Sequence, residues 1–228
     1  MNTTKLALIA TATVAVMFAS PALTANAQSA CASLGGTVDG DQTCHVHSAT
    51  SNYTLDMSFP VDYPDQDALG AYLTEDREQF VGWIARATPD GRHRPYVHDV
   101  TAKVYRSAAD TQSVVLEIQD DTGAAHQGHP DTHFKAFNYD VSNRVPITFD
   151  TLFKTAADPV AVLNPIIQRQ LGTHAEAPFN DLDANTYRNF ALTDDAVIFF
   201  IPQGMWLAEV AGPQRVSVPR SELASVLA

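Results

Sequence analysis

The sequence predicts one α+β domain, because strand-like and helix-like segments both occur without alternating strictly. Apolar and polar side chains alternate over residues 51–60, which is typical of a strand with one buried face. Over residues 65–86, apolar side chains recur at helical spacing. Three further strand-like runs follow the helix, which excludes a regular parallel sheet made of strand–helix–strand units.

The first strand and the helix have clear ends. Pro64 and Asp65 begin the helix, and the turn-forming residues 89–91 follow its end at about Arg86. The three strand-like runs that come next span residues 96–105, 112–120 and 132–141. The first half of the mature chain is therefore predicted to be mostly sheet, with one long helix.

The second half of the chain mixes shorter elements. We expect a short strand at 146–149, a last strand at 216–218 and a last helical turn or two at 221–227. Asp158 is predicted to cap a helix that runs from Pro159 to about Leu171, with a distortion at Pro165. Residues 190–202 are predicted to form a hairpin with its turn at 194–195.

Residues 1–27 have the pattern of a secretory signal peptide. Lys5 precedes an apolar run from 6 to about 19, and Ala25-Asn26-Ala27 is a small-x-small cleavage site. We therefore expect residues 28–228 to form the mature protein outside the cytosol. No later stretch approaches the roughly 20 apolar residues of a membrane span.

Charge and cysteine content narrow the class of protein further. Removing residues 1–27 changes the net charge from −12 to −13, since that segment holds Lys5 and no acid. Such a charge argues against nucleic acid and anionic lipid surfaces but permits a basic partner. Cys31 and Cys44 are the only cysteines, and in a secreted chain an even pair is expected to form a disulfide.

Two groups of histidines are candidate metal ligands. His126, His129 and His133 cluster near Asp131, but their spacing fits no zinc motif and Pro130 indicates a loop. His45 and His47 would share one strand face, and two ligands alone are too few. We predict no metal site and, in the absence of a phosphate-binding loop or a dinucleotide motif, no cofactor.

The sequence contains few signals for catalytic or binding residues. The G-x-S-x-G elbow is absent, although a Ser-His-Asp triad assembled from distant residues stays open. No catalytic residue is assigned. Met205 and Trp206 follow the predicted hairpin in a predicted loop, where an exposed Met–Trp pair would serve as an anchor for a partner protein. These two residues are the predicted binding surface.

The chain also resembles a known family over its whole mature length. The two cysteines and segments 59–65, 134–139, 146–153, 189–200 and 211–221 are similar, in order, to the secreted immunogenic proteins of mycobacteria. Those proteins carry the RsiV-type domain of unknown function. The resemblance implies a variation on the β-grasp fold, in which a mixed sheet packs against helices and one disulfide ties the N-terminus.

The resemblance implies two kinds of function. RsiV-type extracellular domains can bind proteins, as in an anti-sigma factor that recognises lysozyme, and ester hydrolysis has been proposed for some relatives. The family's Gly-Gly-x-His-Pro segment corresponds to residues 123–130, where either His126 or His129 is the counterpart, so no active-site residue is transferred.

The resulting prediction is a secreted, acidic, non-catalytic module that binds a protein partner of the host or the cell envelope. A small secreted esterase is the alternative. The protein is expected outside the cell, either released or retained in the cell wall.

Overall fold

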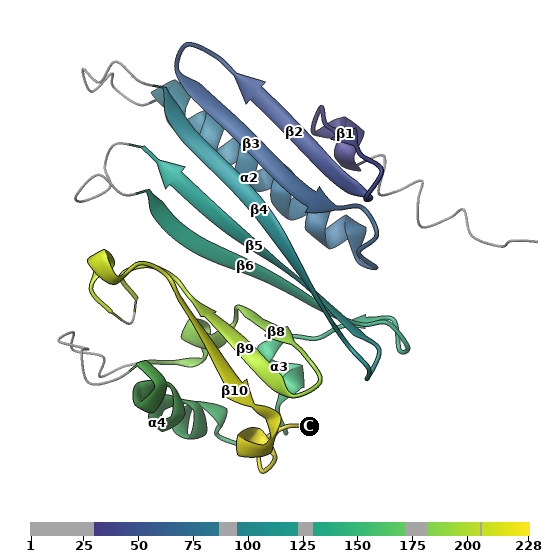
Figure 1. Cartoon of the computed structure of the whole chain (residues 1–228), viewed down its shortest axis with the longest axis vertical. Coiled ribbons are helices and arrows are strands. Elements are labelled where there is room, and N and C mark those ends of the chain that lie inside the picture. Colours follow the sequence, from purple (N-terminus) through teal and green to yellow (C-terminus); the bar gives the residue numbers. More distant parts are fainter. Residues whose placement is uncertain (1–29, 87–94, 123–129, 172–181, 206) are drawn as a thin grey trace, which may run out of the picture.

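The first half of the chain forms a large mixed sheet (Figure 1). The computed structural model describes residues 30–86, 95–122, 130–171, 182–205 and 207–228. Seven strands lie side by side in chain order: β1 (Thr37–Val38), β2 (Thr43–Ala49), β3 (Tyr53–Pro60), β4 (Tyr96–Ser107), β5 (Thr111–Asp121), β6 (Asp131–Asp140) and β7 (Val145–Pro146). All neighbouring pairs are antiparallel except β3 and β4, which are parallel and are connected through helix α2 (Gln66–Arg86).

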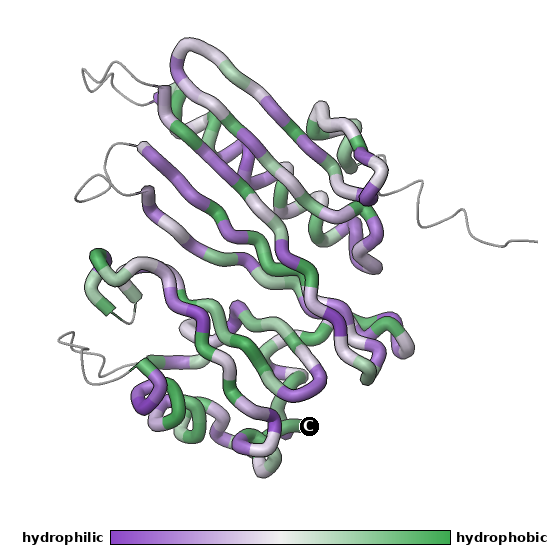
Figure 2. The backbone as a smooth tube through the Cα atoms, viewed as in Figure 1, coloured by the Kyte–Doolittle hydropathy of each residue, from purple (hydrophilic) through white to green (hydrophobic). Residues whose placement is uncertain are grey.

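Helix α2 covers one face of this sheet. Its buried side chains include Leu69, Leu73 and Phe80, which belong to the same apolar cluster as Leu55 and Met57 of β3. Hydrophilic and hydrophobic residues alternate along β2, β3 and β4 (Figure 2). This alternation produces a buried face toward α2 and a more polar face away from it. The predicted strand and helix of this region are thereby confirmed.

The second half of the chain forms a smaller unit with its own core. A three-stranded antiparallel sheet has the order β10-β9-β8, and its strands are β8 (Phe190–Leu192), β9 (Ala196–Ile201) and β10 (Gln214–Pro219). Helices α3 (Phe149–Leu152) and α4 (Pro159–Leu171) and three short 3-10 helices, η2 (Ala184–Tyr187), η3 (Glu209–Ala211) and η4 (Arg220–Leu223), complete it. Its buried cluster includes Leu163, Tyr187 and Phe199.

A third apolar cluster joins the two units. Val115 and Phe134 of the large sheet pack against Ala191 of β8 and Phe200 of β9. Val115 lies on the face turned away from α2, because its neighbours Val114 and Leu116 belong to the core under the helix. Phe134 shares that face, since it is two residues from Ala136, the strand partner of Val115. An ion pair between Arg215 and Glu117 adds a polar link at the same junction.

Two predicted elements differ from the structure. Residues 146–149 were expected to form one strand, but only Val145–Pro146 pairs with β6. The hydroxyl of Thr148 instead accepts a hydrogen bond from the backbone N–H of Thr151, which starts the one-turn helix α3. The last helical turn is present as the short 3-10 helix η4, but it begins at Arg220 and ends at Leu223, before the expected end at 227. The helix over Pro159–Leu171 is present and accommodates Pro165.

The α+β fold class is confirmed, with a mixed sheet, helices and an N-terminal disulfide. The Cys31–Cys44 bond has a Cα–Cα distance of 5.8 Å, and both cysteines are buried. The β-grasp likeness and the division into 1–27 and 28–228 stay predictions. Among the described residues, no helix is both long and apolar enough to cross a membrane.

Candidate functional site

A recess of about 410 Å³ lies beside α2 where the helix faces the ends of three strands. We call it the acidic recess, and its principal side chains are Asp76, Phe80 and Trp83 from α2, His98 from β4, Asp120 from β5, and Asp131 and His133 from β6. Strand pairing brings these residues together, because His98 lies opposite Asp120 and Asp120 opposite Asp131. Successive strands therefore deliver their polar groups to the face that α2 covers.

His98 occupies the centre of the acidic recess and is 1% exposed. Its Nδ1 lies 2.7 Å from Oδ1 of Asp120, and its Nε2 lies 2.9 Å from Oδ2 of Asp76. The ring of Phe80 stacks on the imidazole with 4.7 Å between the centroids. A buried ring that is held by two carboxylates and one aromatic face has a fixed position.

The charge of His98 follows from these contacts. Burial by itself lowers the pKa of His98, because a low-dielectric interior disfavours the charged ring. Hydrogen bonds to Asp120 and Asp76 and the charges of these carboxylates outweigh burial and raise the pKa to about 9. At neutral pH both ring nitrogens therefore donate a proton and neither has a free lone pair. His98 is suited to holding Asp76 and Asp120 in place, not to acting as a base or a metal ligand.

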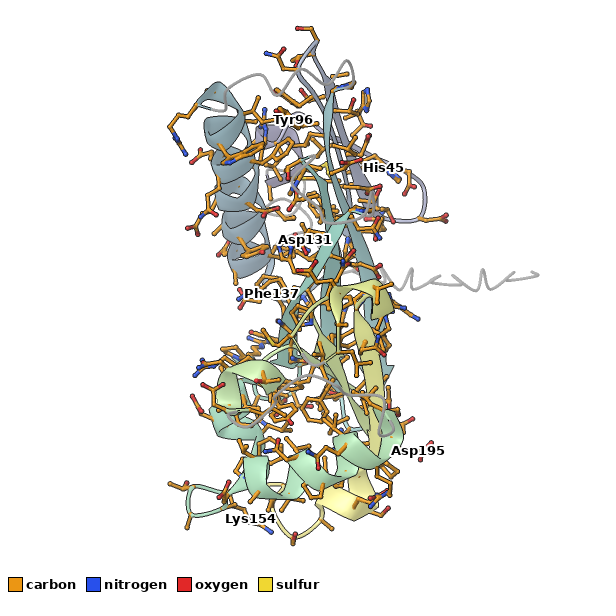
Figure 3. The ribbon with its side chains drawn as sticks, turned by 90° about the vertical axis from the view of Figure 1, so that its left-hand side faces the viewer. His45, Tyr96, Asp131, Phe137, Lys154 and Asp195 are labelled. Carbon is orange, nitrogen blue, oxygen red and sulfur yellow. A yellow bond between two sulfur atoms is a disulfide. The ribbon has the colours of Figure 1, made fainter. Side chains whose placement is uncertain are left out.

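Aromatic side chains form one wall of the acidic recess. Trp83 is 39% exposed, although it lies at an apolar position of the helical pattern. Its ring makes an edge-to-face contact with Tyr96, with 5.2 Å between the centroids. Tyr96 lies between α2 and the sheet (Figure 3). The recess thus combines an exposed tryptophan, a residue type that often dominates the binding energy of protein interfaces, with carboxylates that can attract a basic partner.

A second polar arrangement, which we call the serine row, lies on the opposite face of the sheet. His45 and Ser58 face each other across β2 and β3, and His45 is on the side away from α2 (Figure 3). Nδ1 of His45 is 3.0 Å from Oγ of Ser58, and Nε2 is 3.0 Å from Oδ2 of Asp39. The order serine, histidine, aspartate is that of a nucleophile, its base and an orienting acid.

The electrostatics of the serine row are compatible with proton transfer. Hydrogen bonds from the backbone N–H of Thr43 and from His45 hold the pKa of Asp39 below its usual value. An ionised Asp39 favours the tautomer of His45 with the proton on Nε2, which leaves Nδ1 to accept the Ser58 proton. The row is nevertheless open to solvent, since the side chains of His45 and Asp39 are 51% and 42% exposed.

The predicted histidine groups do not form a common site. His133 and Asp131 line the acidic recess, whereas His126 and His129 lie outside the described residues. His45 and His47 share the outward face of β2, as expected, but His47 bonds separately to Asp56 with 2.6 Å between Nδ1 and Oδ1. Within the part of the chain that the structure describes, no group of three or more His, Cys, Asp or Glu side chains could hold a metal ion.

The predicted binding surface is described only in part. Met205 is 44% exposed beyond the end of β9, and Trp206 lies outside the described residues. Met205 does not line the acidic recess. Sequence reasoning did not find His98 or the exposed side of Trp83. The one available signal was a histidine at an inward position of the strand over residues 96–105.

Comparisons with known proteins connect the chain to mycobacterial proteins. Esterase Rv3036c of Mycobacterium tuberculosis is 44% identical over 207 residues, covering 87% of this chain and 89% of its own length. The immunogenic proteins MPB64 of Mycobacterium bovis and MPT64 of Mycobacterium tuberculosis are each 38% identical over 232 residues, covering 98% of this chain and 99% of their own lengths. Residues 150–221 match a family described as a protein of unknown function, DUF3298.

Two solved structures of DUF3298 proteins have a similar fold. The protein from Bacteroides fragilis has a TM-score of 0.52 at 13% identity, covering 85% of this chain and 94% of its own. The protein from Pseudomonas aeruginosa has a TM-score of 0.57 at 14% identity, covering 83% and 95%. At these identities, the likeness extends to the fold alone.

Proposed function

The chain belongs to the family of the mycobacterial immunogenic proteins MPB64 and MPT64, and from this membership we propose that it is an exported protein that binds another protein. The secretory pattern of residues 1–27 and the disulfide between Cys31 and Cys44 support a place outside the cytosol. In that place the protein is either released or retained in the cell wall.

The acidic recess is the observation that carries the proposed binding function. Trp83 offers an exposed aromatic face, and His98 fixes the carboxylates of Asp76 and Asp120 beside it before any partner arrives. Preorganised groups lose little conformational entropy on binding, so they contribute more to affinity than mobile side chains do. With a net charge of −12 for the full chain, a basic partner is favoured.

A basic protein of defined structure provides the test. Lysozyme, added to the oxidised mature protein, is expected to bind with an affinity that falls as salt rises, because salt screens the attraction. Trp83→Ala and Asp131→Asn are expected to weaken binding. Asp195→Asn, at the far end of the molecule (Figure 3), makes the same charge change as Asp131→Asn and should leave binding intact. Binding that does not depend on salt, or on these two residues, would contradict the proposal.

A specific observation also favours a second candidate function, ester hydrolysis. The relative that is 44% identical carries the name esterase, and the serine row has the required residue types within hydrogen-bond distance. In this proposal Ser58 Oγ attacks the ester carbonyl while its proton moves to Nδ1 of His45. His45 returns that proton to the leaving alkoxide, and water then hydrolyses the acyl-serine while Asp39 orients the ring.

Covalent labelling tests the esterase candidate directly. A fluorophosphonate probe is expected to label Ser58 in folded protein, to fail after heat unfolding and to fail with Ser58→Ala. Ser51→Ala, in the exposed turn before β3, is the matched control and should keep the labelling. Absence of labelling in folded protein would exclude Ser58 as an activated nucleophile and would leave protein binding as the proposed function.

A further inference from the structure

A second cavity lies at the junction of the two units and has a volume of about 330 Å³. It is bounded by Tyr63 before α2, by residues 135–138 of β6, which alternate between the two faces of the sheet, and by the segments around α3 and β8. Small-molecule pockets typically measure about 300–1,000 Å³ and often form where two structural units meet. The cavity is separate from the acidic recess, since none of the described residues lines both.

Apolar and aromatic groups form most of the cavity wall. Phe137 lies on the α2 side of the sheet (Figure 3), and its ring centroid is 6.4 Å from that of Tyr63. Phe149 and Phe190 line the opposite side of the cavity, and both are buried. Packing in the core of the smaller unit therefore holds them in place. Such walls exclude water from an apolar ligand and strengthen any charge interaction at the same place.

Two cationic side chains reach this cavity, in contrast to the acidic charge of the whole chain. Lys135 lies over the rings of Tyr72 and Phe137, with its Nζ 5.3 and 5.4 Å from the two centroids. Arg188 is exposed and lines the cavity from the second unit. Among the described residues, neither cation forms an ion pair. Both charges are therefore available to a ligand.

Among the described residues that line the cavity, Asp65 is the one acid, and a single carboxylate does not balance two cations. Asp65 uses Oδ1 to accept the backbone N–H of Ala68 at 3.2 Å, in the first turn of α2. A carboxylate at a helix N-terminus is stabilised there by the unpaired N–H groups of the first turn. The cavity thus keeps an excess of positive charge.

A buried amide adds an unused polar group. Asn138 lines the cavity and is 4% exposed, and its Nδ2 donates to the backbone oxygen of Phe190 at 2.9 Å. Its Oδ1 is buried and has no hydrogen-bond partner. A buried acceptor without a donor costs free energy, so a site that brings a donor to it gains stability.

We propose that this cavity binds a small monocarboxylate with an apolar body. The carboxylate would lie at the mouth between Arg188 and Lys135, and the apolar body would contact Phe137 and the buried phenylalanines of the second unit. A hydroxyl or amide N–H on the body would be the donor for Asn138, after a small rotation of its amide. This proposal does not depend on either function proposed above.

Titration with octanoate, observed by NMR on the oxidised full mature protein, tests the proposal. Octanoate is expected to shift the signals of Tyr63 and Phe137, and 1-octanol, which lacks the charge, is expected to bind at least about tenfold more weakly. Arg188→Gln is expected to weaken octanoate binding by about two- to fivefold, since Arg188 is solvent-exposed and only part of its charge interaction is realised. Arg86→Gln, an exposed arginine at the far end of α2, removes the same charge outside the cavity and should bind as wild type does.

Three results would overturn the proposal. The first is the absence of shifts at Tyr63 and Phe137 with octanoate. Equal affinity for octanoate and 1-octanol is the second, because it would indicate an apolar cavity without anion recognition. The third is equal weakening by Arg188→Gln and Arg86→Gln, because it would indicate attraction to overall charge. Amide spectra of both variants would first establish that each one folds as the wild type does.

Discussion

Substitution of His98 by glutamine should remove a pH-dependent part of the free energy of unfolding. In the folded protein the pKa of His98 is raised to about 9 by its two carboxylate partners, against 6.5 for an unperturbed histidine side chain. Proton binding is therefore stronger in the folded state than in the unfolded state. The stabilisation is fully present below about pH 6.5 and is lost as the pH rises through about 9. The difference between the two pKa values corresponds to about 3 kcal/mol.

Urea denaturation at about pH 6 and about pH 9.5 measures this effect. The wild-type protein is expected to lose about 3 kcal/mol more than His98→Gln over this range. His47→Gln, at an exposed histidine paired with one carboxylate, is the matched control and should follow the wild type. Burial raises the pKa values of Tyr63, Tyr72 and Tyr187, so their ionisation in the unfolded state lowers stability at high pH. This loss is common to wild type and His98→Gln and cancels in the comparison.

Two results would contradict the predicted charge of His98. If wild type and His98→Gln lose equal stability between the two pH values, His98 does not carry its charge into the folded state. An NMR titration of the His98 ring that shows a midpoint below about pH 7 would lead to the same conclusion by a direct route.

Three further predictions concern the packing of the fold. Gly36→Ala is expected to destabilise the protein by about 1–3 kcal/mol, because the added methyl would lie 2.7 to 2.9 Å from both disulfide sulfurs and a valine methyl. Gly40→Ala meets nothing within 4 Å and should be close to neutral in the same urea experiment. Reduction of the disulfide is expected to lower the free energy of unfolding by about 3 kcal/mol, and an unchanged urea midpoint would contradict this. Phe200, which is 1% exposed, lies between the two units, and Phe200→Ala is expected to lower the free energy of unfolding by about 3–5 kcal/mol. Calorimetry of this variant should show two unfolding transitions in place of one. A single cooperative transition would show that other contacts couple the units.

Elements whose pattern is local were predictable from the sequence. The strand β3 and the helix α2 each carry a clear period, and both occur within one or two residues of the expected bounds. The hairpin of β8 and β9 was found for the same reason. By contrast, Ile147 and Phe149 suggested a strand, but the reciprocal hydrogen bonds of Thr148 and Thr151 start a helical turn there.

The acidic recess was beyond the reach of sequence reasoning because its residues come from separate elements. His98 is 22 residues away from both Asp76 and Asp120, and only the strand register and the packing of α2 bring the three together. Periodicity identified Trp83 as an apolar helix position but did not show that it lies at the rim of a recess. The serine row likewise depends on the pairing of β2 with β3.

The order of the strands has a consequence for how the molecule is assembled. From β1 to β7, each strand of the large sheet pairs with the strand that precedes it in the chain, so every addition extends an edge that already exists. A chain that is synthesised from its amino end can therefore build this sheet strand by strand. Most steps close only a short loop, and helix α2 is added between β3 and β4. The smaller unit, which needs residues up to the carboxyl end, would complete last and would close onto a surface already in place.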